Sequence, residues 1–307
     1  MTILCKRLSV TKESITIAGY AVVNGCQSIN SLFDNKSFIT SELRILTKLI
    51  EIEPDSELAK KITDHTNNQN GITARDLQSN SPIPTRLQSE VHKRFPEFHY
   101  RIKRGEHPDW DKSSIIENEL LARIILAFDL DKVEAWSQNY KLFDDLHGEL
   151  FGRPEVNADR VVFLFEAYGA ITSQLDLLTD KLFARYTLTR WLLIYLVKQA
   201  LMGDDKGRKL CANPPPFMVE QGGRTRLKEC LGHVAKNIVR VLESTVKLRK
   251  LQTPYFDYKN DLKNRVVIEQ LASVVIPQYQ IIIDNKYTVS FSEKWDSSSI
   301  GWLPLKG

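Results

Sequence analysis

The sequence predicts an α+β protein with a mixed α/β front half, a mainly helical middle and a β-hairpin tail. Three observations lead to this class. β-Branched runs and helix-like segments alternate in the first hundred or so residues, apolar residues recur at helical spacing between residues 115 and 252, and β-branched and aromatic runs return after residue 278. We expect three domains: an α/β domain over residues 1–112, a helical domain over 113–260 and a tail over 261–307 that packs on the rest.

The chain should open with two strands and a helix. Residues 6–10 and 15–23 are predicted to form a strand pair, because β-branched side chains dominate the second run. Asn24-Gly25 follows as a turn, since glycine takes positive φ without steric cost and asparagine tolerates it. A short helix over 27–33 is expected next.

The rest of the front half contains a strand, two helices and a loop. Residues 42–53 are mostly apolar and predict a strand. Residues 56–63 show helical spacing, and the amide-rich run 67–72 is expected to end that helix. Two prolines predict a loop over 79–84, since each disfavours helical backbone in the residue before it. A helix over 85–94 follows.

The middle of the chain is predicted to be helical and the tail to be a hairpin. Apolar residues at helical spacing predict helices over 115–128, 159–178, 187–202 and 223–252. The tail runs 278–283 and 287–291 predict two strands joined by Asp284-Asn285-Lys286.

The helix over 223–252 carries basic residues opposite its apolar face. This side contains five basic and two acidic residues: Lys228, Lys236, Arg240, Lys247, Lys250, Glu229 and Glu243. We prefer to interpret it as a solvated exterior, and a nucleic-acid surface is the alternative.

Two amide-rich segments about forty residues apart are the candidate ligand site. Asn24, Gly25 and Gln27 lie where a strand gives way to a helix, whose free N–H groups and dipole suit a phosphate or carboxylate. The second segment, Asn67-Asn68-Gln69-Asn70, offers several donors and acceptors to a base edge, a sugar or a phosphate. A plain structural turn and a capped helix end are the alternative interpretations of the two segments.

Basic residues follow the second segment. Seven basic and three acidic residues fall between 75 and 104, and eleven basic and five acidic residues fall between 203 and 252. We expect Arg101 and Arg104 to grip phosphates in bidentate fashion. Asp76 is placed at the same site, where it orients Arg75 or a helix N-terminus. A solvated basic surface explains the same surplus.

Composition excludes several classes of protein. The densest apolar stretch, residues 191–197, is far short of the roughly 20 residues that a membrane span needs, and the start lacks a signal-peptide pattern. The four cysteines form no Cys-x-x-Cys pair, so no structural zinc is predicted. No Gly-rich phosphate loop, Gly-x-Ser-x-Gly elbow or His-Glu-x-x-His pair is present. We expect a cytoplasmic protein with no membrane partner and no metal site.

Three motifs together resemble a known family. They are Val-Asn-Gly-x-Gln-Ser-Ile at 23–29, Thr-Asn-Asn-Gln-Asn-x-Ile-x-Ala-x-Asp-Leu-x-Ser-Asn at 66–80, and Tyr-Arg-x-Lys-Arg-Gly-Glu at 100–106. Their order and spacing resemble the abortive-infection phage-resistance (AIPR) family of bacterial defence proteins. The resemblance implies an anti-phage function in the bacterial cytoplasm, in which these motifs bind nucleic acid or a nucleotide.

The turn at Asn24 is also similar to the Asp-Gly-Gln motif of ParB-like proteins, several of which bind or hydrolyse nucleotides. This similarity implies an alternative function as a nuclease or nucleotide hydrolase. Its carboxylates would come from Asp76, Glu90, Glu106 and Asp109, with Mg²⁺ as the expected ion. Asn24 replaces the aspartate of that motif, which weakens the inference.

Members of the AIPR family usually carry a long region before these motifs. The chain therefore resembles the C-terminal half of a longer protein, a shortened member, or a fragment whose missing half comes from a partner chain. The last possibility gives a third candidate function, a non-catalytic sensor or interaction subunit.

Overall fold

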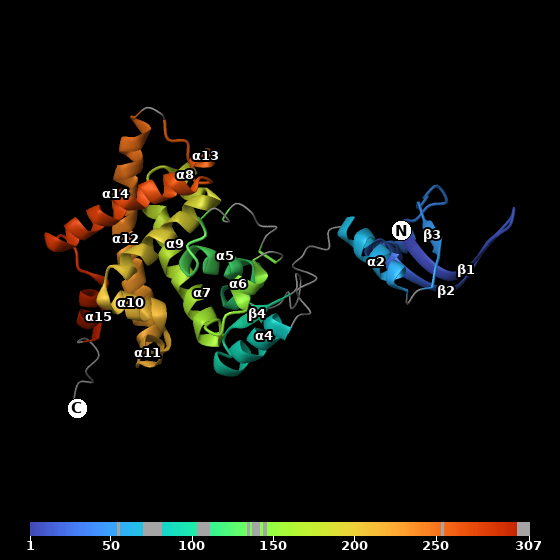
Figure 1. The fold of residues 1–307 in the computed structure, drawn as a ribbon, viewed down its shortest axis with the longest axis horizontal. Helices are drawn as coiled ribbons and strands as arrows, with labels where there is room; N and C mark the ends of the chain where they lie inside the picture. Colours follow the sequence, from blue (N-terminus) through green and yellow to red (C-terminus); the bar gives the residue numbers. More distant parts are fainter. Residues whose placement is uncertain are drawn as a thin grey trace. The chain divides into compact units, whose positions relative to one another are not determined.

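The computed structural model describes residues 1–53, 56–69, 82–102, 111–133, 136, 142–143, 146–252 and 255–299. Contacts divide the chain into two compact units, Met1–Leu77 and Gln78–Gly307. We describe each unit by itself. The predicted α+β class is confirmed, because small sheets lie in the front half and helices make up most of the rest (Figure 1). The division falls after Leu77, whereas we expected the first boundary near residue 112.

A three-stranded sheet of order β2-β1-β3 forms the first unit. Strands β1 (Thr2–Val10) and β2 (Ile15–Asn24) are antiparallel, which confirms the predicted strand pair. Strand β3 (Lys48–Glu51) runs parallel to β1 and pairs with it only over the first half of β1. The predicted strand over 42–53 was therefore too long. Its apolar residues before β3, such as Leu46, are exposed and contribute nothing to the core.

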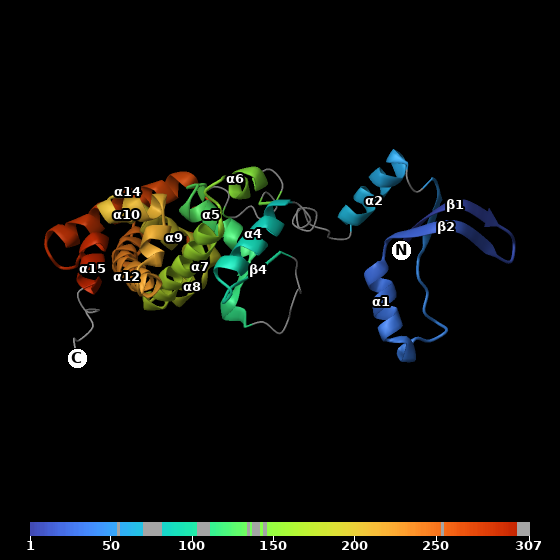
Figure 2. The same cartoon turned by 90° about the horizontal axis from the view of Figure 1, so that it is seen from below.

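Two helices and a short 3₁₀ turn accompany the sheet in the described part of the first unit. Helix α1 (Cys26–Asp34) confirms the predicted short helix, and η1 (Lys36–Phe38) follows it. Helix α2 (Glu57–Gln69) packs against β2 and buries Ala59. The tip of the β1–β2 hairpin extends away from both helices (Figure 2).

Helix α2 continues beyond the predicted end. We expected the amides to stop the helix, but the helix runs through Asn67 and Asn68 to Gln69. Asparagine and glutamine lose less than about 0.7 kcal/mol relative to alanine in a helix, so a few of them do not stop one that is already packed.

The second unit begins with a helix and two short parallel strands. Helix α4 (Pro82–Arg94) contains Pro84, which we had placed in a loop; a proline is tolerated in the first helical turn, where its missing N–H is not needed. Strand β4 (His99–Arg101) pairs with β5 (Ile115–Glu117), which follows η2 (Lys112–Ser114). Helix α5 (Asn118–Phe128) therefore starts three residues later than predicted.

The remaining helices pack around one long central helix. Helix α12 (Gly223–Lys250) contacts α7, α9, α11, α14 and α15 (Figure 1). The other elements are α6 (His147–Phe151), α7 (Ala158–Thr172), η5 (Ser173–Leu177), α8 (Lys181–Arg185), α9 (Thr187–Met202), α10 (Asp205–Ala212), α11 (Pro215–Val219), α13 (Tyr258–Asp261), α14 (Arg265–Asp284) and α15 (Phe291–Ser299).

The predicted β-hairpin tail is wrong. Residues 278–283 form the last turns of α14, and Phe291 begins α15. The buried residues of α14 recur at helical spacing: Ile268, Leu271, Ala272, Val275, Tyr279 and Ile283. They form one stripe that packs on α9 and α12. The burial of this stripe outweighs the β propensity of the branched side chains.

Helix α14 is the one described helix with the length and hydropathy to cross a membrane. Of its most apolar window, 28% is buried inside the unit. One such helix is also typical of soluble proteins, so it does not indicate a membrane protein.

Candidate functional site

The turn between β2 and α1 is the best-described part of the predicted ligand site. Asn24 is the last residue of β2 and pairs with Thr2. Gly25 has φ +101°, and a Cβ added there would lie 3.1 Å from the Cα of Met1 and 3.2 Å from its Cβ. Glycine is favoured here, because a side chain at this positive φ would be strained and would also lie tightly against Met1. Met1 of the chain itself thus lies close to Gly25.

Helix α1 starts directly after this glycine. The carbonyl of Gly25 accepts a hydrogen bond from the Ile29 N–H at 3.0 Å, which closes the first helical turn. The N–H groups of residues 26–28 precede that bond, so the helix offers them no acceptor of its own. The first turn carries no acidic side chain that could occupy this position. The turn therefore has the geometry that suits a phosphate or carboxylate.

Both amide-rich segments fall within the first unit, in which α2 packs against β2. Asn67, Asn68 and Gln69 have helical backbone at the end of α2. Their side chains, and that of Gln27, lie outside the part of the chain that the structure describes. Asn70, Asp76 and Arg104 also lie outside it.

Arg101 belongs to the second unit, whereas Asn24 and Gly25 belong to the first. It lies in β4 and forms an ion pair with Glu117, its register partner in β5. The side chain of Arg101 is 20% exposed. Its charge is thus already compensated by a carboxylate, an arrangement that the sequence did not reveal.

The described residues supply little of the predicted hydrolase machinery. Glu90 pairs with Arg86 one turn earlier in α4 at 3.2 Å, while Asp76, Glu106 and Asp109 lie outside the described residues. Within the part that is described, no group of three or more histidine, cysteine, aspartate or glutamate residues could hold a metal ion.

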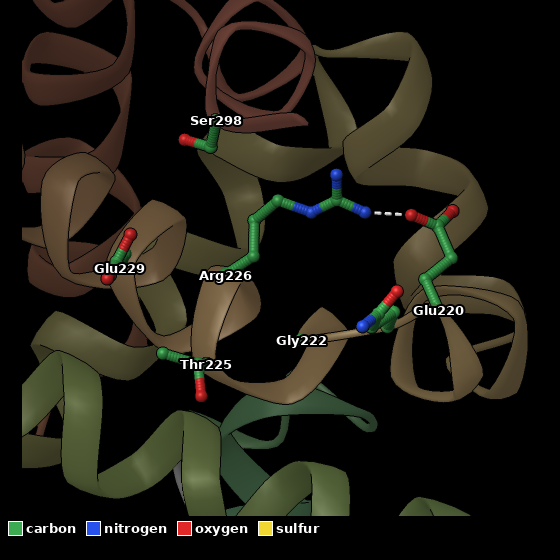
Figure 3. A pocket seen from close by; sticks show the side chains of 7 residues that line it. Glu220, Gly222, Thr225, Arg226, Glu229 and Ser298 are labelled. Carbon is green, nitrogen blue, oxygen red and sulfur yellow. Dashed lines mark hydrogen bonds and ion pairs between the residues drawn. The ribbon is translucent and has the colours of Figure 1, made fainter. Parts of the chain in front are cut away.

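A pocket of about 310 Å³ lies at the N-terminus of α12 (Figure 3). Arg226 reaches across it to an ion pair with Glu220, and its guanidinium stacks 3.8 Å from the ring of Trp295. Glu229 and Ser298 line the same space. One arginine and two carboxylates leave the pocket without a marked charge preference. Sequence reasoning missed it because Trp295 lies on α15, in the tail that we had assigned to a hairpin.

Comparison with known proteins gives one result. The search of curated proteins and the search of solved structures found no match. A family model described as "AIPR protein" matches residues 1–267 of the 307. This span includes the three motifs, both described sheets, and the helices through α13. The chain therefore belongs to the AIPR family, and this membership supports a role in abortive-infection phage resistance.

Proposed function

We propose that this AIPR protein acts in phage defence by binding nucleic acid or a nucleotide at the turn between β2 and α1. One observation carries the proposal: Gly25 ends the strand so tightly that α1 begins at once, with the N–H groups of residues 26–28 ahead of its first hydrogen bond. Such helix starts suit phosphate groups, because both the free N–H groups and the helix dipole attract negative charge.

The amides of α2 would supply the selectivity of this site. Asn67, Asn68 and Gln69 stand at the end of a helix that packs against β2. Amide side chains both donate and accept hydrogen bonds, so they fix the orientation of a base or sugar more sharply than a cation does. Gln27, Asn70 and Asp76 belong to the same proposed set.

The decisive comparison uses paired variants in a phage-plating assay. Asn68→Ala with Gln69→Ala should abolish protection, whereas Lys60→Ala with Lys61→Ala on the same helix should not. Arg101→Ala with Arg104→Ala tests separately whether these basic side chains contribute to protection. Circular dichroism confirms that each variant folds. The site assignment is wrong if the folded amide and arginine variants both protect as well as the parent.

The salt dependence of nucleic-acid binding by the purified protein distinguishes a phosphate backbone from a small polar ligand. Nucleic-acid affinity should fall steeply with salt, because phosphate contacts release counterions. Filter binding across a salt series measures this slope. If only the amide pair matters and the salt response is flat, a small polar ligand becomes the better assignment.

A second candidate function is a subunit that docks on a partner chain. The hairpin tip carries two apolar cross-strand pairs on one face, Leu8–Ile17 and Val10–Ile15. Val10 and Ile15 are 66% and 59% exposed. Apolar side chains that are this exposed and lie together on one face favour burial against a partner protein.

Co-expression with the product of the preceding open reading frame tests this candidate. Val10→Lys with Ile15→Lys should abolish co-purification, while Lys12→Ser in the adjoining turn should leave it intact. Equal recovery of the partner with both variants would remove the hairpin face from consideration.

A further inference from the structure

An open groove of about 500 Å³ runs beside α12 in the second unit. Its lining includes Lys228, His233 and Lys236 of α12, Gln174 of η5 and Lys294 of α15. Gly232 brings α12 close to η5: a Cβ added there would lie 3.7 Å from both the Ala170 carbonyl oxygen and Gln174 Nε2. Three elements far apart in the sequence thus contribute polar side chains to one surface.

The basic side of α12 divides into a neutralised part and an uncompensated part. Lys247 pairs with Glu243 at 3.4 Å, and Lys250 pairs with Asp180 at 2.6 Å. In the groove, Lys228 lies 3.5 Å from Glu166. Lys236 and Lys294 form no ion pair within the described residues, and Arg240, one turn beyond Lys236, forms none there either. The lysines at the C-terminal end of α12 are therefore compensated, whereas those beside the groove keep charge that a ligand could use.

His233 lies among these cations. Its Nε2 is 3.2 Å from the Val289 carbonyl oxygen and 3.1 Å from Thr288 Oγ1, so the ring is held in place. Burial lowers the pKa of His233 most, and the charges of Lys294, Lys236 and Arg240 lower it further, against the opposing effect of the hydrogen bond to Val289. A bound anion would be attracted by these lysine and arginine charges and would offset their lowering effect on the pKa of His233.

The chemistry of the groove suits a chain of spaced negative charges. Its open shape admits a polymer, and neutral donors such as Gln174 line it together with the lysines. Glu229 also lines it and is its one acidic member among the described residues. Among the described lining residues there is no phenylalanine, tyrosine or tryptophan on which a base would stack, and the one aromatic ring, that of His233, is already held by Val289 and Thr288. Lysine charge without stacking or base-edge contacts gives binding that does not depend on sequence.

We propose that this groove binds the phosphodiester backbone of a nucleic acid without reading its sequence. Lys236 and Lys294 each contact a phosphate, and Gln174 donates a hydrogen bond to the same backbone. The surface lies in the second unit, so the proposal does not rest on a ligand at the turn before α1.

The test is fluorescence anisotropy of the full chain with a labelled oligonucleotide across a salt series. Lys236→Gln with Lys294→Gln removes the two uncompensated lysines of the groove. Lys209→Gln with Lys263→Gln is the matched control, because both residues are exposed, form no ion pair within the described residues and do not line the groove. The slope of log affinity against log salt should become shallower by about 1.4 for single strands or about 1.8 for duplex in the groove variant only.

A second pair of variants changes shape without changing charge. Gly232→Met would place a long side chain in the groove and should weaken binding. Gly169→Met is its control, since a Cβ added at Gly169 meets nothing within 4 Å. Circular dichroism verifies that all variants fold.

Several results would overturn the proposal. One is an equal loss of oligonucleotide affinity in the groove variant and the lysine control variant, which would mean that only the net charge of the protein matters. Another is a parent protein that binds poly-glutamate but no oligonucleotide, which would assign the groove to an acidic protein. The Asn68→Ala, Gln69→Ala variant is titrated in parallel: if it alone loses oligonucleotide binding, the groove proposal fails and the turn proposal stands. Loss in the groove variant alone supports the groove and counts against the turn as the nucleic-acid site.

Discussion

Asp129→Asn should remove a large part of the stability of the second unit. The carboxylate is 2% exposed and accepts hydrogen bonds from the guanidinium groups of Arg160 and Arg153, with Arg160 Nε and Arg153 Nη2 each at 3.2 Å. Arg160 is only 11% exposed and reaches one other acceptor, the Cys211 carbonyl oxygen at 2.6 Å. The asparagine keeps the shape but leaves the buried Arg160 charge without its counterion.

The expected loss is about 3 kcal/mol, at the lower end of the range for breaking a buried pair, because Arg153 is 29% exposed and stays solvated. Urea unfolding followed by circular dichroism measures it as a lower midpoint at unchanged slope. Asp205→Asn is the control: its pair with Arg208 is largely exposed, so the loss should stay below about 1 kcal/mol. Equal midpoints for the two variants would refute the argument from burial. Adding Arg160→Met to Asp129→Asn should recover part of the loss, since the uncompensated charge is then gone.

Three further predictions follow from single residues. Gly25→Ala should destabilise the first unit by about 1 to 3 kcal/mol, because it forces a side chain into positive φ against Met1, and thermal melting of the purified variant checks this. His147 is buried and burial lowers its pKa, so the unfolded chain binds the proton more readily. The melting temperature should therefore fall as the pH drops through about 6.5, and it should fall less in His147→Phe. The same pH dependence of the melting temperature in both proteins would contradict this. Gly169→Ala should stabilise α7 by about 0.5 to 1 kcal/mol, because alanine favours helical backbone and the added methyl group meets no atom within 4 Å. The urea midpoint should rise, and a lower midpoint would contradict this prediction.

Long periodic elements could be predicted from the sequence, and short or composite ones could not. Helices α9 and α12 match their predicted ranges to within two residues, since many apolar positions define their buried faces. Helix α14 was missed because the prediction considered only its last, β-branched turns; the helical period is visible over the full twenty residues. Strand β5 has three residues, too few for a strand to be told from the helix that follows it.

The turn before α1 was predictable, but the charges around the functional surfaces were not. Asn24 and Gly25 lie next to each other in the sequence, and their local chemistry alone suggests a strand end and a helix start. The pairing of Arg101 with Glu117, and the presence of Lys294 beside Lys236, depend on tertiary packing between distant segments. Sequence counts of basic residues cannot separate the lysines that are already neutralised from those that are available to a ligand.

The contact between Met1 and Gly25 governs how this protein can be labelled. The Met1 nitrogen donates to the Leu46 carbonyl oxygen at 2.9 Å, and its carbonyl accepts from the Lys48 N–H at 2.9 Å. The same residue fills the space where a side chain on Gly25 would lie. Any peptide, tag or dye joined to Met1 is therefore attached close to Gly25 and the start of α1. A dye at that position would be a sensitive reporter of a ligand at the turn, whereas a bulky fusion there would obstruct it.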